Sequence, residues 1–278
     1  SSAPAQLPTA KLKPARARQH ESWVKLLFMA LSYTDWPTPN QDARPDSAET
    51  IDILVLHYTG MQTATAALDR MRDPAAKVST HWCIDEDGQI YRLVPETMRA
   101  WHAGLSYWRQ RQLVNDTSIG IELVNPGHEF GYRPFPRAQM EALIVLAGDV
   151  LSRHQIPSAN VVGHSDIAPL RKLDPGELFD WARLAQYGIG LWPQPTSEPH
   201  SQLIALELGA SGPEVRALQK NLFDFGYGPT IDGHYGEESE TIVRAFQRHF
   251  RQARVDGVAD GATQAILKHL LARSGRAA

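Results

Sequence analysis

The sequence predicts an α/β fold in which one central sheet is covered by helices, followed by a small helical module. Two observations support this prediction. Between residues 51 and 186, short apolar runs rich in β-branched residues alternate with segments of helical periodicity. After residue 202, three apolar stripes at helical spacing are separated by two Asp-Gly turns, which resemble a weak internal repeat. The chain has 278 residues, enough for one large domain and a small one.

The elements of the larger part follow from length, periodicity and turn signals. The run 51–57 has the length and β-branched content of a buried strand. The sequence Asp-Glu-Asp-Gly at 85–88 predicts a hairpin turn. In chain order, we expect strands at 51–57, 81–84, 89–94, 118–124 and 161–163, and helices at 65–72, 137–153 and 178–186.

Proline-rich segments mark the expected boundaries. The prolines between residues 36 and 45 exclude a regular helix and predict an extended segment. Three prolines within residues 192–199 predict a linker. We therefore expect an N-terminal arm with a short helix at 1–35, a main domain at 36–193, a Pro-rich linker at 194–202 and a module at 203–275.

The apolar stretch at 23–32 has two interpretations. Four basic residues precede it, as in a signal peptide, and Ala30-Leu31-Ser32 resembles a cleavage site. Lys25 interrupts the apolar run, however, and this favours a short amphipathic helix that docks on the main domain. No apolar run reaches the ~18 residues that a membrane-spanning helix needs.

Composition excludes few functions. The formal net charge of -3 gives no indication of a nucleic-acid partner. The single cysteine, Cys83, cannot form an intrachain disulfide. It lies between Trp82 and Ile84 in an expected strand, which indicates a small buried apolar residue rather than a nucleophile.

Three residues at the ends of apolar runs form a candidate metal site. His57 ends the run 53–56, His164 follows the run 161–163, and Asp174 comes ten residues later. Two imidazoles and one carboxylate are a ligand set for zinc that leaves one coordination position open, which is typical of hydrolytic sites. An isolated histidine is usually not a ligand, so the flanking sequence carries much of this argument.

Two charged residues are candidates for the chemistry beside such a metal. Glu122 interrupts an apolar strand, where a buried carboxylate is costly, and it could serve as a general base toward water. Lys172 lies two residues before Asp174, so in an extended segment both side chains point the same way and the cation could stabilise an oxyanion. The alternatives are an exposed position on an alternating strand for Glu122 and a solvated loop lysine for Lys172.

The motifs around these residues resemble one known family. They occur in the order Leu56-His57-Tyr58-Thr59, Ala100-Trp101-His102-Ala103-Gly104, Ser118-Ile119-Gly120-Ile121-Glu122, Gly163-His164-Ser165-Asp166 and Lys172-Leu173-Asp174-Pro175-Gly176. Together they resemble the zinc-dependent N-acetylmuramoyl-L-alanine amidases, relatives of the peptidoglycan recognition proteins, over residues 36–193.

This resemblance implies a mixed sheet with flanking helices and one zinc ion per chain, bound by His57, His164 and Asp174. Catalytic roles for Glu122 and Lys172 are also implied. The reaction would cut the amide bond between the lactyl group of N-acetylmuramic acid and L-alanine. We place Trp101, His102 and Asn125 in the substrate groove, with ordinary packing as the alternative for Trp101 and His102.

The small module resembles the three-helix peptidoglycan-binding domain. The matching residues are Leu208-Gly209, Gly212-Pro213-Glu214-Val215, Leu218-Gln219, Gly226-Tyr227, Asp232-Gly233-His234-Tyr235-Gly236 and Ala245-Phe246-Gln247. The resemblance implies polymer binding without chemistry. We therefore expect intact cell wall as a substrate in addition to soluble muropeptides. This expectation favours a location in the cell envelope, in the periplasm, over the cytoplasm.

Two other classes of function compete with a zinc amidase. A binding protein on the same fold would recognise muropeptides without cutting them, but such relatives typically lack metal ligands, and all three are present here. A serine hydrolase is poorly supported, because the sequence has no Gly-x-Ser-x-Gly motif.

Overall fold

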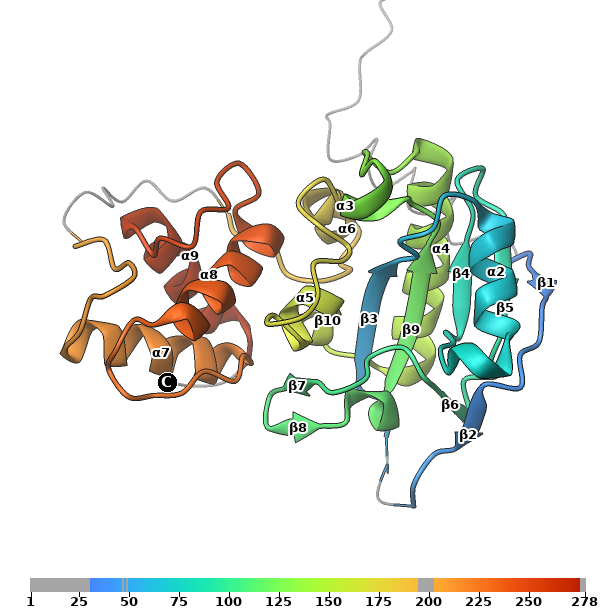
Figure 1. The fold of residues 1–278 in the computed structure, drawn as a ribbon, viewed down its shortest axis with the longest axis horizontal. Coiled ribbons are helices and arrows are strands. Elements are labelled where there is room, and N and C mark those ends of the chain that lie inside the picture. The colour runs from blue at the N-terminus through green and yellow to red at the C-terminus, as the bar shows by residue number, and fades with distance from the viewer. Residues whose placement is uncertain (1–30, 47, 49, 195–202, 276–278) are drawn as a thin grey trace, which may run out of the picture. The chain divides into compact units, whose positions relative to one another are not determined.

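The computed structural model describes residues 31–46, 48, 50–194 and 203–275 (Figure 1). From Ser32 onward the chain groups into one compact unit. Most of the arm and short helix expected at 1–35 and of the linker expected at 194–202 lies outside the described residues, which leave out 1–30 and 195–202. In the part of the chain that the structure describes, no helix is both long and apolar enough to cross a membrane.

A six-stranded mixed sheet forms the centre of the larger part (Figure 1). Its order is β1 (Thr34–Asp35), β5 (Ile90–Arg92), β4 (Trp82–Ile84), β9 (Ser118–Leu123), β3 (Ile53–Tyr58) and β10 (Val161–Gly163). The β4–β5 pair is antiparallel, as a hairpin requires, and the other pairs are parallel. The strands expected from sequence are therefore all present in one sheet.

Two short strand pairs lie outside this sheet. The first joins β2 (Gln41–Ala43) to β6 (Met98–Ala100), and the second joins β7 (Tyr107–Trp108) to β8 (Arg111–Gln112), both antiparallel. The segment 36–45, expected to be extended, contains β2 and follows directly on β1. Sequence periodicity did not predict the short hairpin of β7 and β8.

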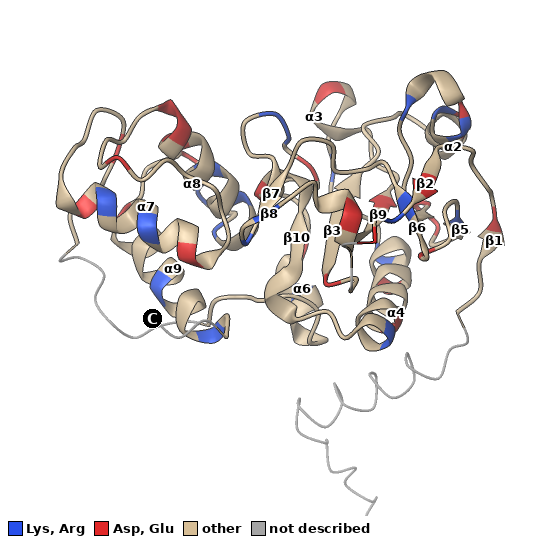
Figure 2. Cartoon of the chain, turned by 90° about the horizontal axis from the view of Figure 1, so that it is seen from below, with Lys and Arg blue, Asp and Glu red and all other residues tan. Residues whose placement is uncertain are grey.

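Helices α2 (Ala64–Arg72) and α4 (Arg137–His154) lie on opposite faces of the sheet (Figures 1 and 2). The Thr63 hydroxyl accepts the Ala66 N–H and so begins α2. Helix α6 (Trp181–Gln186) begins three residues later than expected, because the Asp180 carboxylate caps it by accepting the Arg183 N–H. The remaining helical segments here are α3 (Gly127–Phe130), α5 (His164–Ile167) and the 3₁₀ turns Pro74–Ala76, Val114–Thr117 and Ser158–Asn160.

The module consists of α7 (Pro213–Phe225), α8 (Glu237–Phe250) and α9 (Gly261–Arg273). The expected internal repeat has a physical basis in two buried glutamines. Gln219 accepts the Gly233 N–H and Gln247 accepts the Gly257 N–H, so each glutamine holds one Asp-Gly turn against its helix. Helices α7 and α8 each carry acidic and basic residues (Figure 2).

One buried apolar cluster runs through both parts of the compact unit. It contains Val55 of β3 and Trp108 of β7 together with Leu222 of α7 and Phe246 of α8. The apolar faces of the module therefore pack into the same core as part of the larger domain.

Candidate metal centre

The register of three parallel strands brings the predicted residues together. Leu56 of β3 is paired with Gly163 of β10, so His57 lies beside the end of β10, where His164 begins α5. On the other side, His57 is paired with Glu122 of β9. Paired residues of parallel strands point to the same face of a sheet, so this register places the His57 and Glu122 side chains on one face, and His164 joins them from the start of α5.

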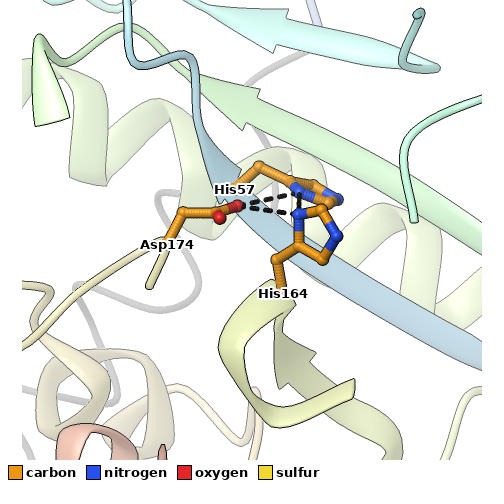
Figure 3. Close-up of side chains that lie close together, drawn as sticks. All are labelled: His57, His164 and Asp174. Carbon is orange, nitrogen blue, oxygen red and sulfur yellow. Dashed lines mark hydrogen bonds and ion pairs between the residues drawn. The ribbon is translucent and has the colours of Figure 1, made fainter. Parts of the chain in front are cut away.

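Asp174 completes the group from the loop after α5 (Figure 3). The Ser165 N–H donates to the Asp174 carbonyl at 2.8 Å, which holds the loop against the end of β10. Gly163 permits this approach, because a Cβ atom there would lie 2.6 Å from Cδ of Pro175.

The three side chains converge on a common point (Figure 3). Nδ1 of His57 lies 3.0 Å from Nδ1 of His164 and 3.0 Å from Oδ2 of Asp174, and the third edge of the triangle is 3.1 Å. Four ligands around zinc at about 2.1 Å are separated by about 3.4 Å. The triangle is thus close to the size that a tetrahedral zinc ion requires, and the donor set suits this metal.

The other ring nitrogen of each histidine has its own partner. Nε2 of His164 lies 3.1 Å from the carbonyl of Ala103, and Nε2 of His57 lies 3.0 Å from Nδ1 of His102. A carbonyl can only accept, so His164 carries its proton on Nε2 and leaves Nδ1 free. Such outer contacts fix the tautomer and the orientation of a metal-binding imidazole.

The protonation states also suit a cation. Burial is the largest influence on the pKa of His57 and lowers it to about 4. Burial by itself would raise the pKa of Asp174, but the contacts with His164 and His57 hold it well below its usual range. Neutral imidazole and ionised carboxylate are the forms that bind metal.

Glu122 lies beside this centre with one oxygen unused. Its Oε2 is shielded from solvent and has no hydrogen-bond partner among the described residues. Burial, and next the charge of Asp174, raise the pKa of Glu122 to about 8. The side chain also borders a small cavity of about 50 Å³, room for a few water molecules. A carboxyl with a pKa raised to this range has the properties of a general base.

Lys172 lies in the loop that carries Asp174, close to His57 and Glu122. Its charge lowers the pKa of both His57 and Glu122, after the larger effect of burial on each. The side chain is partly buried, so it is not fully solvated. The structure therefore brings together all five residues expected at the metal and in the chemistry.

The three residues expected in the substrate groove have other surroundings. His102 is 5% exposed and stands behind His57, where its Nε2 lies 3.1 Å from Oγ of Ser118. Gly120 makes room for it, because a Cβ atom there would lie 2.5 Å from the imidazole. This placement differs from the expected contact with substrate. It indicates instead that His102 supports the imidazole of His57.

Asn125 is fully buried, and its amide binds the chain around it. Nδ2 donates to the Arg133 carbonyl and Oδ1 accepts the Gly127 N–H, so the side chain holds the loop after β9. Trp101 is half-buried and lies beside Asp42, whose pKa is lowered chiefly by its hydrogen bonds with Arg99 and to a smaller degree by Trp101. Both residues have partners within the protein, which weakens the expectation of a direct role in the groove.

Two supporting residues, Ala103 and Ser118, were not predicted from the sequence. Both lie within the motifs that carry the family resemblance, and this position was the one feature of the sequence that could have indicated a role at the site. Cys83 is buried as expected, and burial raises the pKa of its thiol well above the usual range. This disfavours a cysteine nucleophile.

Comparisons with known proteins agree with this geometry. The family model described as N-acetylmuramoyl-L-alanine amidase matches residues 47–177, and a peptidoglycan binding domain model matches residues 211–267. The N-acetylmuramoyl-L-alanine amidase AmiD of Escherichia coli (strain K12) is 40% identical over 242 residues, which cover 81% of this chain and 84% of AmiD.

Two solved structures share the fold. AmiD from E. coli, in complex with the substrate anhydro-N-acetylmuramic acid-L-Ala-D-gamma-Glu-L-Lys, gives a TM-score of 0.72 at 38% identity and covers 84% of this chain and 94% of that one. AMPDH3 from Pseudomonas aeruginosa gives a TM-score of 0.68 at 31% identity and covers 90% of this chain and 98% of that one.

A mixed sheet at whose edge two imidazoles and a carboxylate converge on one point fits the metal-dependent class of amidases. The chain belongs to the N-acetylmuramoyl-L-alanine amidase family, and its C-terminal module belongs to the peptidoglycan-binding domains.

Proposed function

We propose that this amidase uses one zinc ion, held by His57, His164 and Asp174, to hydrolyse the amide bond between the lactyl group of N-acetylmuramic acid and L-alanine. The observation that carries the proposal is the triangle of ligand atoms, 3.0 to 3.1 Å on each side, beside Glu122, whose Oε2 has no hydrogen-bond partner within the described residues. A zinc ion supplies Lewis acidity, which activates water and polarises a carbonyl.

The residues of the chain supply the remaining steps. Glu122 accepts a proton from the attacking water and later returns it to the nitrogen of L-alanine, which leaves as an amine. Lys172 stabilises the negative charge that develops on the carbonyl oxygen. His102 and the Ala103 carbonyl keep the two imidazoles in the orientation that presents Nδ1.

We further propose that intact peptidoglycan is a substrate beside soluble muropeptides. AmiD has been solved in complex with an anhydro-muramyl peptide substrate, which supports binding of such fragments by this chain. The match of residues 211–267 to a peptidoglycan binding domain supports attachment to the polymer. These two points favour the cell envelope as the place of action, and within it the periplasm.

A binding protein without activity is the competing interpretation on the same fold. It is disfavoured, because the three candidate ligands lie together and Oε2 of Glu122 has no partner among the described residues. Muropeptide binding alone gives no reason for a carboxylate oxygen that is shielded from solvent and has no partner in the described part of the chain, because such an oxygen costs stability.

Digestion of purified peptidoglycan tests the proposal. The full chain is incubated with insoluble peptidoglycan and with soluble anhydro-muropeptide, each with and without chelator, and products are identified by mass spectrometry. We expect free stem peptides that begin with L-alanine, their loss on chelation and their return with zinc. Glycan fragments, activity indifferent to the chelator, or binding without cleavage would contradict it.

A further inference from the structure

The single turn α5, which begins with the metal ligand His164, is tied to the C-terminal module by one buried carboxylate. Asp166 is 1% exposed. Its Oδ2 accepts the N–H of Gly163 at 2.7 Å, and this contact closes the turn on itself. The same carboxylate also receives two donors from the module.

Those two donors are Tyr227, which follows α7, and His249 of α8. The Tyr227 hydroxyl donates to Oδ1 of Asp166 at 2.5 Å, and Nδ1 of His249 lies 2.7 Å from Oδ2. A carboxylate in this setting can only accept, so His249 carries a proton on Nδ1. Hydrogen bonds to an ionised group away from water are among the stronger ones in proteins.

Packing holds both donors in place. His249 stacks on Trp181 of α6 at a ring-centroid distance of 3.7 Å, and on Phe250 at 3.8 Å. Tyr227 is fully buried and meets the edge of Trp108 at 5.2 Å. Neither side chain can leave Asp166 without breaking apolar contacts.

The surrounding contacts bring the module and the larger domain close together at this junction. A Cβ atom on Gly226 would lie 2.8 Å from the indole of Trp108, so glycine is needed between α7 and Tyr227. Farther along the junction, the Arg109 N–H donates to the Gly226 carbonyl and the Gln252 amide donates to the Phe179 carbonyl.

We propose that Tyr227 and His249 are positioning residues of the metal centre. By fixing Asp166 they hold α5, and α5 sets the position of Nδ1 of His164 relative to His57 and Asp174. The peptidoglycan-binding module thus contributes to metal binding in addition to any contact with polymer. This inference rests on the proposed function only in taking His164 as a zinc ligand.

Zinc affinity of the full-length protein, measured by competition with a chromophoric chelator in the absence of substrate, tests this role. Tyr227→Phe removes one hydroxyl and keeps the ring, and we expect zinc to bind about tenfold more weakly, the lower end of what supporting residues of metal sites contribute. Tyr235→Phe is the matched control. Tyr235 is equally buried in the module, but its hydroxyl donates to the Gly257 carbonyl. We expect its zinc affinity to equal that of the parent.

A pair of substitutions at His249 separates the hydrogen bond from the stacking. His249→Phe keeps an aromatic ring without a donor, and His249→Asn supplies an amide donor near the position of Nδ1. We expect the asparagine variant to retain more zinc affinity than the phenylalanine variant. The visible spectrum of the cobalt-substituted protein should change for Tyr227→Phe and His249→Phe and stay the same for Tyr235→Phe.

Zinc affinity of Tyr227→Phe within twofold of the parent would overturn the inference, and so would equal losses in Tyr227→Phe and Tyr235→Phe. If His249→Phe fails to fold, the comparison of the two tyrosine variants decides alone. Because substrate is absent, these outcomes are independent of amidase activity. A parent that binds zinc tightly but cuts no amide would contradict the proposed function and leave this inference standing.

Discussion

Nε2 of His57 lies 3.0 Å from Nδ1 of His102, on the side of the imidazole that faces away from Asp174. Burial keeps the pKa of His102 well below its usual range, so this ring is neutral and one of its nitrogens can accept. With its own proton on Nε2, it can donate to Oγ of Ser118 at 3.1 Å. His102 thereby fixes the tautomer that presents Nδ1 of His57.

Replacing His102 should therefore weaken metal binding. His102→Ala leaves Nε2–H of His57 without an acceptor, and we expect zinc affinity to fall about 10- to 100-fold. His102→Gln offers a carbonyl oxygen in its place and should retain more affinity. Chelator competition measures both variants, and equal affinity of His102→Ala and the parent would argue for a packing role only.

Glu122→Gln separates the chemistry from metal binding. The amide has the shape of the carboxyl group but cannot take up a proton, so turnover should fall by at least about 10²-fold while zinc content stays at the parent's level. Glu129→Gln, at an exposed position, is the matched control and should be unaffected. Near-normal turnover of Glu122→Gln would remove Glu122 from the role of base.

Lys172 should influence the pH dependence of the reaction. The base must be ionised, so kcat/KM rises with pH through the pKa of Glu122. Burial and the charge of Asp174 raise that pKa to about 8, and the charge of Lys172 opposes them. Lys172→Met should thus move the rising limb to higher pH and lower kcat about 10²-fold, as loss of an oxyanion contact does. Lys172→Arg keeps the positive charge, so the rising limb of kcat/KM should stay at the same pH. An unchanged pH profile for Lys172→Met would show that the charge of Lys172 does not influence the pKa of Glu122.

Glu96 offers a test of stability away from the metal. Burial alone would raise its pKa, but hydrogen bonds from Arg153, His154 and Trp82 lower it from 4.5 to about 2. This difference corresponds to about 2 to 3 kcal/mol of stability. Because the folded pKa lies below the unfolded one, the contribution is complete above about pH 4.5 and is lost as the pH falls toward 2.

Urea unfolding of Glu96→Gln against the parent measures this contribution. At pH 7 we expect the free energy of unfolding to be about 2 to 3 kcal/mol lower in the variant, and the gap should close between pH 4.5 and 2. The exposed Glu207→Gln serves as control and should show no gap at any pH. A gap that does not change with pH would mean that the ion pairs are not its source.

The sequence was most informative where chemistry is tied to strand ends. His57, His164 and Glu122 each follow or interrupt an apolar run, and the pairing of β3, β9 and β10 brings them side by side. Local patterns could not predict the orientation of the His102 side chain, because its partners His57 and Ser118 lie 45 and 16 residues away. A histidine in a motif is compatible with a groove or with support of a ligand, and only the packing distinguishes the two.

The contact between Asp166 and the module was equally invisible in the sequence. Asp166 follows the ligand His164 by two residues, but its donors Tyr227 and His249 are 61 and 83 residues away. A three-helix module after a proline-rich segment suggests independence, whereas the buried cluster continues from Val55 to Phe246. The expected domain boundaries remain predictions.

Metal content tests the central claim most directly. The parent and the variants His57→Ala, His164→Ala and His234→Ala, the last an exposed histidine of the module, are purified without added zinc, and zinc is measured per chain together with release of L-alanine-terminated peptide. We predict one zinc ion per chain with activity in the parent and in His234→Ala, and loss of both in the two ligand variants. Full zinc content in His57→Ala or His164→Ala, or a zinc-free parent with full activity, would contradict the account.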